Sequence, residues 1–133
     1  MASSDEIVIT KRIDTLQAIV SLRNDNIVHV HFKKHTIFDL HLQAELRAVY
    51  AEITGGKKSK FLFTSEEGFT LTKDAREHAR KYPEPHIHAY ALIADNIAYR
   101  IIANFVLKVN KPNVPYRLFA HADDAIRWLQ KLG

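Results

Sequence analysis

Residues 27–32 read Ile-Val-His-Val-His-Phe, a segment in which two kinds of side chain alternate. Successive side chains of a β-strand point to opposite faces, so the valines and the phenylalanine share one face and the histidines share the other. An apolar stretch at residues 18–22 precedes this segment, and the turn-forming sequence Arg-Asn-Asp-Asn at residues 23–26 separates the two. The pattern therefore predicts an antiparallel hairpin with one face turned toward a hydrophobic core.

On both sides of this hairpin the chain shows further strand and helix patterns. Residues 6–10 are apolar and β-branched, which predicts a first strand. Asp39 is a suitable helix N-cap, and apolar residues at helical spacing continue from it to a stop at Gly55 and Gly56. Residues 61–63, Phe-Leu-Phe, are apolar on both faces, which predicts a strand buried from both sides in the middle of a sheet.

The second half of the chain continues this alternation. The predicted elements are a charged helix over 73–81, a strand over 86–93, a helix with a wide apolar stripe over 97–109, a strand over 116–120 and a terminal helix over 125–132. Strands that alternate with helices predict a mostly parallel sheet with right-handed crossovers. No linker or repeat interrupts the pattern, so residues 1–133 are predicted to form a single α/β domain.

The composition limits the classes of function. The chain has 133 residues and no cysteine, which excludes disulfides and thiolate metal sites within it. Its first residues lack the pattern of a signal or transit peptide, and no apolar run approaches the roughly 18 to 20 residues of a membrane span. We therefore expect a cytoplasmic protein without integral membrane association. The net charge of +4 is scattered rather than gathered into a basic stripe, so nucleic-acid binding is not expected.

The C-terminal half carries a pattern typical of one group of proteins. The run AYALIADNIAYRIIANFVLKVNKPNVPYRLFAHADDAIRWLQKL has an Ala-x-Ala strand, an Ile-rich helix, a Pro-x-x-Pro turn and a final DDAIRWL helix. It resembles small bacterial SpoIIAA-like proteins, which belong to the anti-sigma factor antagonist (STAS) domains, and residues 59–80 match the same pattern less strictly. The resemblance covers most of the chain. It implies a β-α superhelix of STAS or CRAL-TRIO type, with a mostly parallel four- to five-stranded sheet, an N-terminal antiparallel hairpin strand and about four helices.

The resemblance also implies a place for a phosphorylation switch. In the phosphorylated STAS antagonists a serine lies in an Asp-Ser-Ser-Gly-like turn, at the start of the helix after the second parallel strand. The matching turn here, residues 69–74, lacks that sequence and offers only the hydroxyls of Thr70 and Thr72. Both threonines suit helix capping. They are therefore candidates either for caps or for a phosphoacceptor that changes partner binding by adding charge.

No catalytic motif accompanies this pattern. The four glycines form no phosphate-binding loop, and no serine or acid lies in a nucleophile elbow. We therefore predict a non-enzymatic, cofactor-free regulatory module that binds a protein partner or pairs with itself as a homodimer. Lys73, Arg76 and Arg80 on the predicted charged helix are the candidate interaction surface for an acidic partner, although such a charge run also suits a plain solvated face.

A second class of function is a carrier or sensor of an apolar small molecule or lipid. Phe69, Tyr90 and Tyr99 could line a pocket near residues 64–72, since ligand sites combine apolar walls with few polar groups. Aromatic residues at this spacing also suit a close-packed core. A co-purified lipid would favour the carrier over the interaction module.

The histidines raise the question of a metal site. His29 and His31 share one face of a strand, about 6.6 Å apart along it, and His86 and His88 form a second pair. Two such pairs could supply four nitrogen ligands to zinc or copper. No carboxylate at ligand spacing accompanies either pair, and the strand at residues 61–63 is expected to lie between them. We therefore favour half-buried structural histidines and predict no metal.

Overall fold

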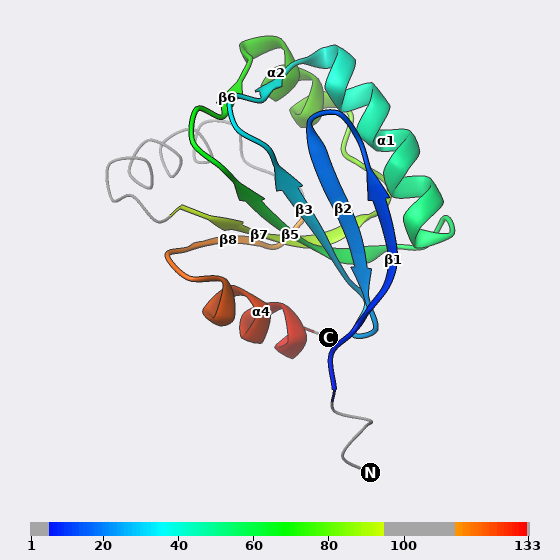
Figure 1. Ribbon diagram of the computed structural model, residues 1–133. Coiled ribbons are helices and arrows are strands. Elements are labelled where there is room, and N and C mark those ends of the chain that lie inside the picture. Colours follow the sequence, from blue (N-terminus) through cyan, green and yellow to red (C-terminus); the bar gives the residue numbers. More distant parts are fainter. Residues whose placement is uncertain (1–5, 95–113, 133) are drawn as a thin grey trace.

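The computed structural model describes residues 6–94 and 114–132, in which a long sheet is flanked by helices (Figure 1). The strands of the main sheet, in spatial order, are β1 (Ile9–Asp14), β2 (Ala18–Arg23), β3 (Ile27–Phe32), β5 (Ser59–Ser65), β7 (Ile87–Ile93) and β8 (Tyr116–Phe119). A second, two-stranded sheet pairs β4 (Ile37–Phe38) with β6 (Thr70–Leu71). The described helices are α1 (Leu40–Thr54), α2 (Lys73–Lys81) and α4 (Ala122–Lys131).

The main sheet is mixed. β1, β2 and β3 pair antiparallel, whereas β3, β5, β7 and β8 pair parallel. Backbone hydrogen bonds close the two N-terminal turns, from Thr15 N to Ala18 O and from Asn26 N to Arg23 O, and such tight turns can join only antiparallel neighbours. The prediction of a mostly parallel, four- to five-stranded sheet is therefore wrong. The sheet has six strands, and the first three of them are antiparallel to one another.

The first strand is displaced from the predicted residues 6–10 to Ile9–Asp14. Val8 N donates to Asn24 Oδ1 at 3.2 Å, and Asn24 Nδ2 donates to Glu6 O at 2.8 Å. The Asn24 backbone N–H also donates to Val8 O at 3.0 Å, so Asn24 bonds to Val8 with both its backbone and its side chain, and the regular ladder begins at Ile9. The apolar pattern predicted this boundary poorly because β1 is an edge strand whose side chains are mostly exposed.

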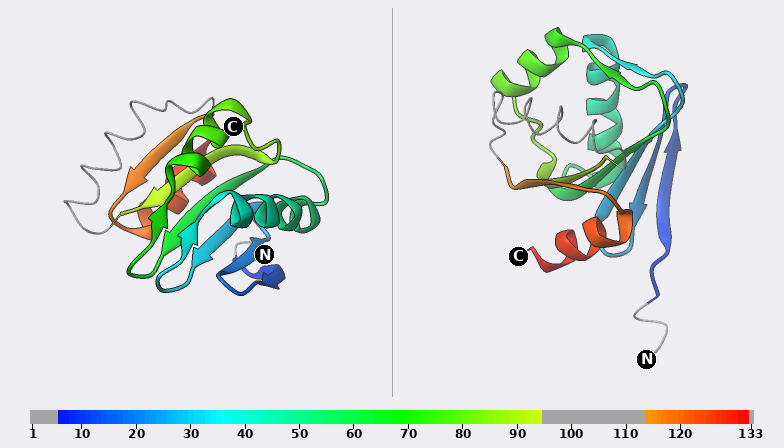
Figure 2. Two further views of the ribbon diagram at one scale, coloured as in Figure 1. Left: turned by 90° about the horizontal axis from the view of Figure 1, so that it is seen from above. Right: turned by 90° about the vertical axis from the view of Figure 1, so that its left-hand side faces the viewer.

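The two faces of the sheet carry separate hydrophobic cores. α1 packs on one face against β2 and β3, and α4 packs on the other face. Figure 2 shows the sheet between α1 and α2 on one side and α4 on the other. Phe61 and Leu62, neighbours on β5, belong to opposite cores and are almost fully buried. This confirms the prediction of a mid-sheet strand that is buried from both sides.

The helix ends follow from local sequence. Asp39 accepts a hydrogen bond from the backbone N–H three residues on, and α1 ends at Gly55 with a φ of 65°, as predicted. Thr72 caps α2 in the same way, whereas Thr70 lies in β6 and caps no helix. The helix predicted over 97–109 lies outside the described residues. Of the three helices in the described ranges, none is long and apolar enough to cross a membrane.

Candidate functional site

The loops that leave the carboxyl ends of β3 and β5 are joined to each other. In parallel α/β sheets, ligands usually bind at this end of the strands. We call residues 33–39 and 65–72 the loop end; they lead directly into the β4–β6 pair. Three backbone hydrogen bonds, each of 2.9 Å, join the two loops: Glu66 N to Phe32 O, His35 N to Glu67 O and Thr70 N to Thr36 O.

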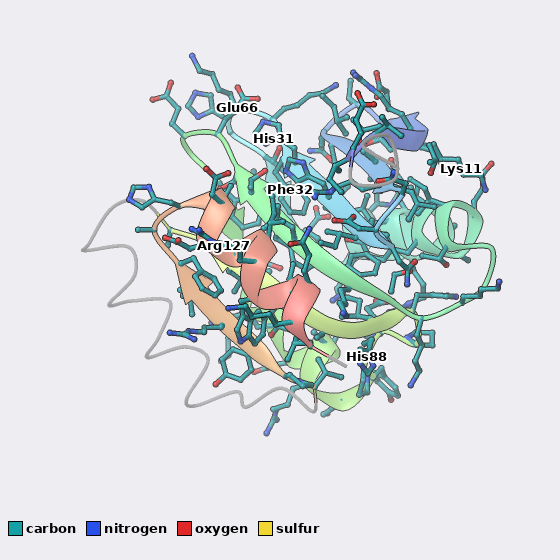
Figure 3. The ribbon with its side chains drawn as sticks, turned by 90° about the horizontal axis from the view of Figure 1, so that it is seen from below. Lys11, His31, Phe32, Glu66, His88 and Arg127 are labelled. Atoms are coloured by element: carbon teal, nitrogen blue, oxygen red, sulfur yellow. The ribbon has the colours of Figure 1, made fainter. Side chains whose placement is uncertain are left out.

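A group of polar side chains crosses from β3 to the loop end. Thr64 Oγ1 lies 2.7 Å from His29 Nε2 and 2.7 Å from His31 Nδ1, and His31 Nε2 lies 3.0 Å from Glu66 Oε2. His29 is paired in register with Leu62 of the α4 core, so these histidines share the face on which α4 packs. Figure 3 shows His31 and Glu66 near each other. We call the four polar residues the His-Thr array.

The hydrogen-bond partners limit where the protons of this array can lie. When His31 is neutral, its Nε2–H donates to the Glu66 carboxylate, which can only accept, and its Nδ1 is left as an acceptor. The Thr64 hydroxyl then donates to that Nδ1, and its oxygen accepts from the Nε2–H of His29. Burial, with a smaller effect of His31, lowers the pKa of His29 from 6.5 to about 4. His29 is therefore neutral at pH 7, and it is the donor to Thr64 while His31 is neutral.

The four histidines considered as metal ligands are not brought together. His29 and His31 lie on β3, His86 precedes β7 and His88 lies on β7, with β5 between the two strands. Within residues 6–94 and 114–132, no three His, Asp or Glu side chains gather in a way that could hold a metal ion. The structure therefore gives the four-histidine zinc or copper alternative no support, and Thr64 occupies the space between the first pair.

Large apolar side chains are exposed at the loop end. Ile37 of β4 is 52% exposed, Leu40 at the start of α1 is 44% exposed and Leu71 of β6 is 38% exposed. Leu16, at the tip of the β1–β2 turn, is 90% exposed, and a hydrogen bond from the Thr36 hydroxyl holds that turn against the loop end. Figure 1 shows this turn, β4, β6 and the starts of α1 and α2 at the same end. We call these four exposed residues the apolar patch.

The predicted contact residues lie on α2, which begins directly after the apolar patch. Lys73 is exposed, and its Nζ lies 4.0 Å from the Glu77 carboxylate. Arg76 Nη1 donates to the carbonyl oxygen of Leu71 at 3.3 Å. Arg80 is exposed and forms no ion pair with any residue that the structure describes. The structure thus places a basic, largely solvated helix beside the apolar patch.

Residues 20–133 match the family described as Domain of unknown function (DUF7793). The chain belongs to this family. No curated protein matches it. The chain is similar to a solved structure of an uncharacterized DUF3478-family protein from Shewanella loihica PV-4, which is described as having a SpoIIAA-like fold. The TM-score is 0.54 and the sequence identity is 10%, and the match covers 92% of this chain and 93% of that chain. At such identity the likeness shows the fold alone, and it confirms the SpoIIAA-like resemblance.

Within this DUF7793 fold, the two candidate switch threonines lie in different surroundings. The Thr72 hydroxyl accepts from Ala75 N at 3.2 Å as the cap of α2. Thr70 is exposed on β6, where its backbone N–H is bonded to Thr36. The capping interpretation is confirmed for Thr72 and wrong for Thr70. A phosphoacceptor role for either residue stays a prediction.

The residues predicted to line a pocket belong to a row of packed aromatic rings. Phe69 packs against Phe32 with ring centroids 4.9 Å apart, and Tyr90 packs against Phe63 at 5.9 Å. Phe32 and Phe63 stack at 6.4 Å and so connect the two. Tyr99 lies outside the described residues. Phe69 and Tyr90 thus share one aromatic row without touching each other, and the carrier function stays a prediction.

Thr64 and Glu66 are the members of the array that sequence reasoning did not predict. Their place depends on the parallel register of β3 and β5, which pairs His31 with Thr64 across 33 residues of sequence. A usable signal was present, since a Thr and a Glu follow the apolar strand at 61–63 at its carboxyl end. Recognising it required the assumption that β3 and β5 are parallel neighbours.

Proposed function

We propose that this DUF7793 protein is a non-enzymatic regulatory module of the cytoplasm that binds an acidic partner protein through its loop end. The observation that carries the proposal is the apolar patch, whose members come from separate segments and lie at the same end of the fold, with Ile37 and Leu71 on opposite faces of the β4–β6 pair. Exposed apolar side chains scattered singly are ordinary, whereas a gathered group marks an interaction site. The basic residues of α2 beside the patch favour a partner that combines acidic and apolar side chains.

A further observation favours binding over catalysis. Thr64, His31 and Glu66 follow the order hydroxyl, imidazole and carboxylate that an activated nucleophile needs. However, the Thr64 oxygen also accepts a hydrogen bond from His29, which draws electron density away from the atom that would attack a substrate. This supports the assignment of the array to a structural or regulatory role, and of the molecule to a non-enzymatic class.

The first test changes the apolar patch. A photo-crosslinking amino acid at Ile37 should capture the partner in cells of the native host, and the captured protein is then identified and purified. We expect Leu71→Glu to weaken binding of that purified partner about tenfold in calorimetry, because it removes an apolar contact and adds repulsion toward acidic side chains. Lys73→Glu should weaken binding less, since a rim charge contributes less than a buried apolar contact.

Ile9→Glu is the matched control for this experiment. Ile9 is also a large exposed apolar residue, 58% exposed, but it lies on β1 at the opposite end of the sheet. Figure 1 shows the start of β1 far from the β4–β6 pair. Equal losses of affinity in Leu71→Glu and Ile9→Glu, with unchanged thermal stability of both, would contradict the proposed surface.

Two further expectations, a homodimer and a carrier function, have separate tests. The homodimer would appear in light scattering, and its loss in Leu71→Glu but not in Ile9→Glu would make a second copy the partner at the loop end. The carrier function rests on the aromatic row, which is only partly buried at Phe63 and Phe69. Native mass spectrometry that shows a co-purified lipid would replace the interaction module by the carrier.

A further inference from the structure

The His31–Glu66 contact joins β3 to the first residues of the loop that carries part of the apolar patch. Glu66 begins the segment that runs through Gly68 to Leu71 and the cap of α2. On the opposite side of this segment, His35 N donates to Glu67 O. The segment is therefore held by backbone bonds to its neighbouring loop and by side-chain contacts to β3, an apolar one from Phe69 to Phe32 and a polar one from Glu66 to His31.

We propose that the His31–Glu66 contact is an acid-strengthened latch that fixes residues 65–72 and, with them, the apolar patch. The role of the latch in partner binding rests on the proposed function, whereas the effect of acid on the contact itself does not. A hydrogen bond between an ion and a neutral group becomes a charge-assisted pair of opposite ions when the imidazole takes up a proton, and such pairs are stronger. Histidine is the side chain that makes this change in mild acid.

The His-Thr array can accept one proton without leaving a polar group unpaired. When His31 is protonated, its Nδ1–H donates to Thr64 Oγ1 and its Nε2–H still donates to Glu66. The Thr64 hydroxyl then turns and donates to His29 Nε2, which becomes an acceptor by a change of tautomer. His29 remains neutral in this step because burial lowers its pKa to about 4. The array thus charges at the exposed end, next to the carboxylate.

The charges around His31 leave Glu66 as its direct ionic partner. Ile19 of β2 separates His31 from Asp14 of β1, and Asp14 is already paired with Arg12 at 2.8 Å. Among the residues that the structure describes, other charged groups on this face and loop include Arg23 paired with Asp25, Lys34 paired with Glu67, Lys33 bonded to Thr15 O, and Asp124 paired with Arg127 on α4. A proton on His31 is therefore balanced mainly by Glu66.

Amide hydrogen exchange followed by NMR tests the latch on the protein alone. The reporters are the amides of His35, Glu66 and Thr70, each of which bonds across the loop end. We expect their protection factors, corrected for the intrinsic effect of pH, to rise about fivefold from pH 7.5 to pH 5.5, which is the gain from making the hydrogen bond charge-assisted. Constant or falling protection factors over this range would overturn the proposal.

Two glutamate variants separate the latch from general acid effects. Glu66→Gln keeps an acceptor for His31 but removes the charge, so the fivefold rise should disappear. Glu67→Gln removes the neighbouring charge, which pairs with Lys34 and not with a histidine, so the rise should persist. If Glu66→Gln keeps the full pH response, or if Glu67→Gln loses it, the assignment to the His31–Glu66 contact is wrong.

The outcome is distinguishable from failure of the proposed function. The exchange experiment contains no partner, so a positive result establishes the latch even if Leu71→Glu has no effect on binding. Conversely, a partner that binds at the apolar patch with equal affinity at pH 7.5 and pH 5.5, together with unchanged protection factors, would leave the docking surface intact and remove the latch.

Discussion

The free energy of unfolding will fall by about 3 kcal/mol between pH 7 and pH 4 through one buried side chain, His29. Burial lowers the pKa of folded His29 from 6.5 to about 4, aided by the charges of His31 and Arg23. The unfolded chain therefore takes up a proton near pH 6.5, before the folded chain does. The stabilisation by neutral His29 is complete above pH 6.5 and is lost progressively as the pH falls toward 4. Below that pH the folded chain is protonated as well, so no further stability is lost through this residue.

A glutamine at this position isolates the effect. His29→Gln keeps an N–H near the place of Nε2 for Thr64 but cannot titrate, so most of the acid-dependent loss should vanish in urea denaturation at pH 7, 6, 5 and 4.5. His41→Gln removes an exposed histidine on α1 and should leave the wild-type pH dependence unchanged. If His29→Gln and the wild-type protein lose stability in parallel, other groups cause the acid sensitivity.

Gly68→Ala will destabilise the fold by about 2 to 3 kcal/mol. Gly68 has a φ of +79°, a conformation that is strained for any residue with a side chain. A Cβ atom here would also clash with His35 Nδ1. The backbone of His35 is held in place, because its N–H donates to Glu67 O and its φ is 57°, so the clash can be relieved only by rotation of the ring. The substitution therefore disrupts both loops of the loop end, as denaturant unfolding should show.

Gly56→Ala separates the two parts of this cost. Gly56 has a φ of +82°, but a Cβ atom there would meet nothing within 4 Å, so only the backbone strain remains and the loss should be about 1 kcal/mol. In the double variant Gly68→Ala, His35→Gly, the clash is removed and part of the stability should return. Equal losses for Gly68→Ala and Gly56→Ala would show that the His35 ring adapts without cost.

Local sequence patterns predicted those elements whose signal lies within a few residues. Asp39 and Gly55 marked the ends of α1, and the period of two along residues 27–32 correctly separated the core face of β3 from its histidine face. β4 and β6 were not predicted, because each has two residues and exists only through pairing with the other. The extent of antiparallel pairing was also missed, since the polar residues of an edge strand such as β1 carry a weak pattern.

In the candidate site too, some features follow from local sequence and others only from the tertiary structure. The sequence by itself determined that His29 and His31 share a strand face, because the alternation of side chains along a strand is a local property of the backbone. Only the tertiary structure decided which side chains form hydrogen bonds with the two histidines. The parallel register of β3 and β5 brings Thr64 to both imidazoles and Glu66 to one of them, and pairings between residues so distant along the chain depend on the packing of the whole sheet.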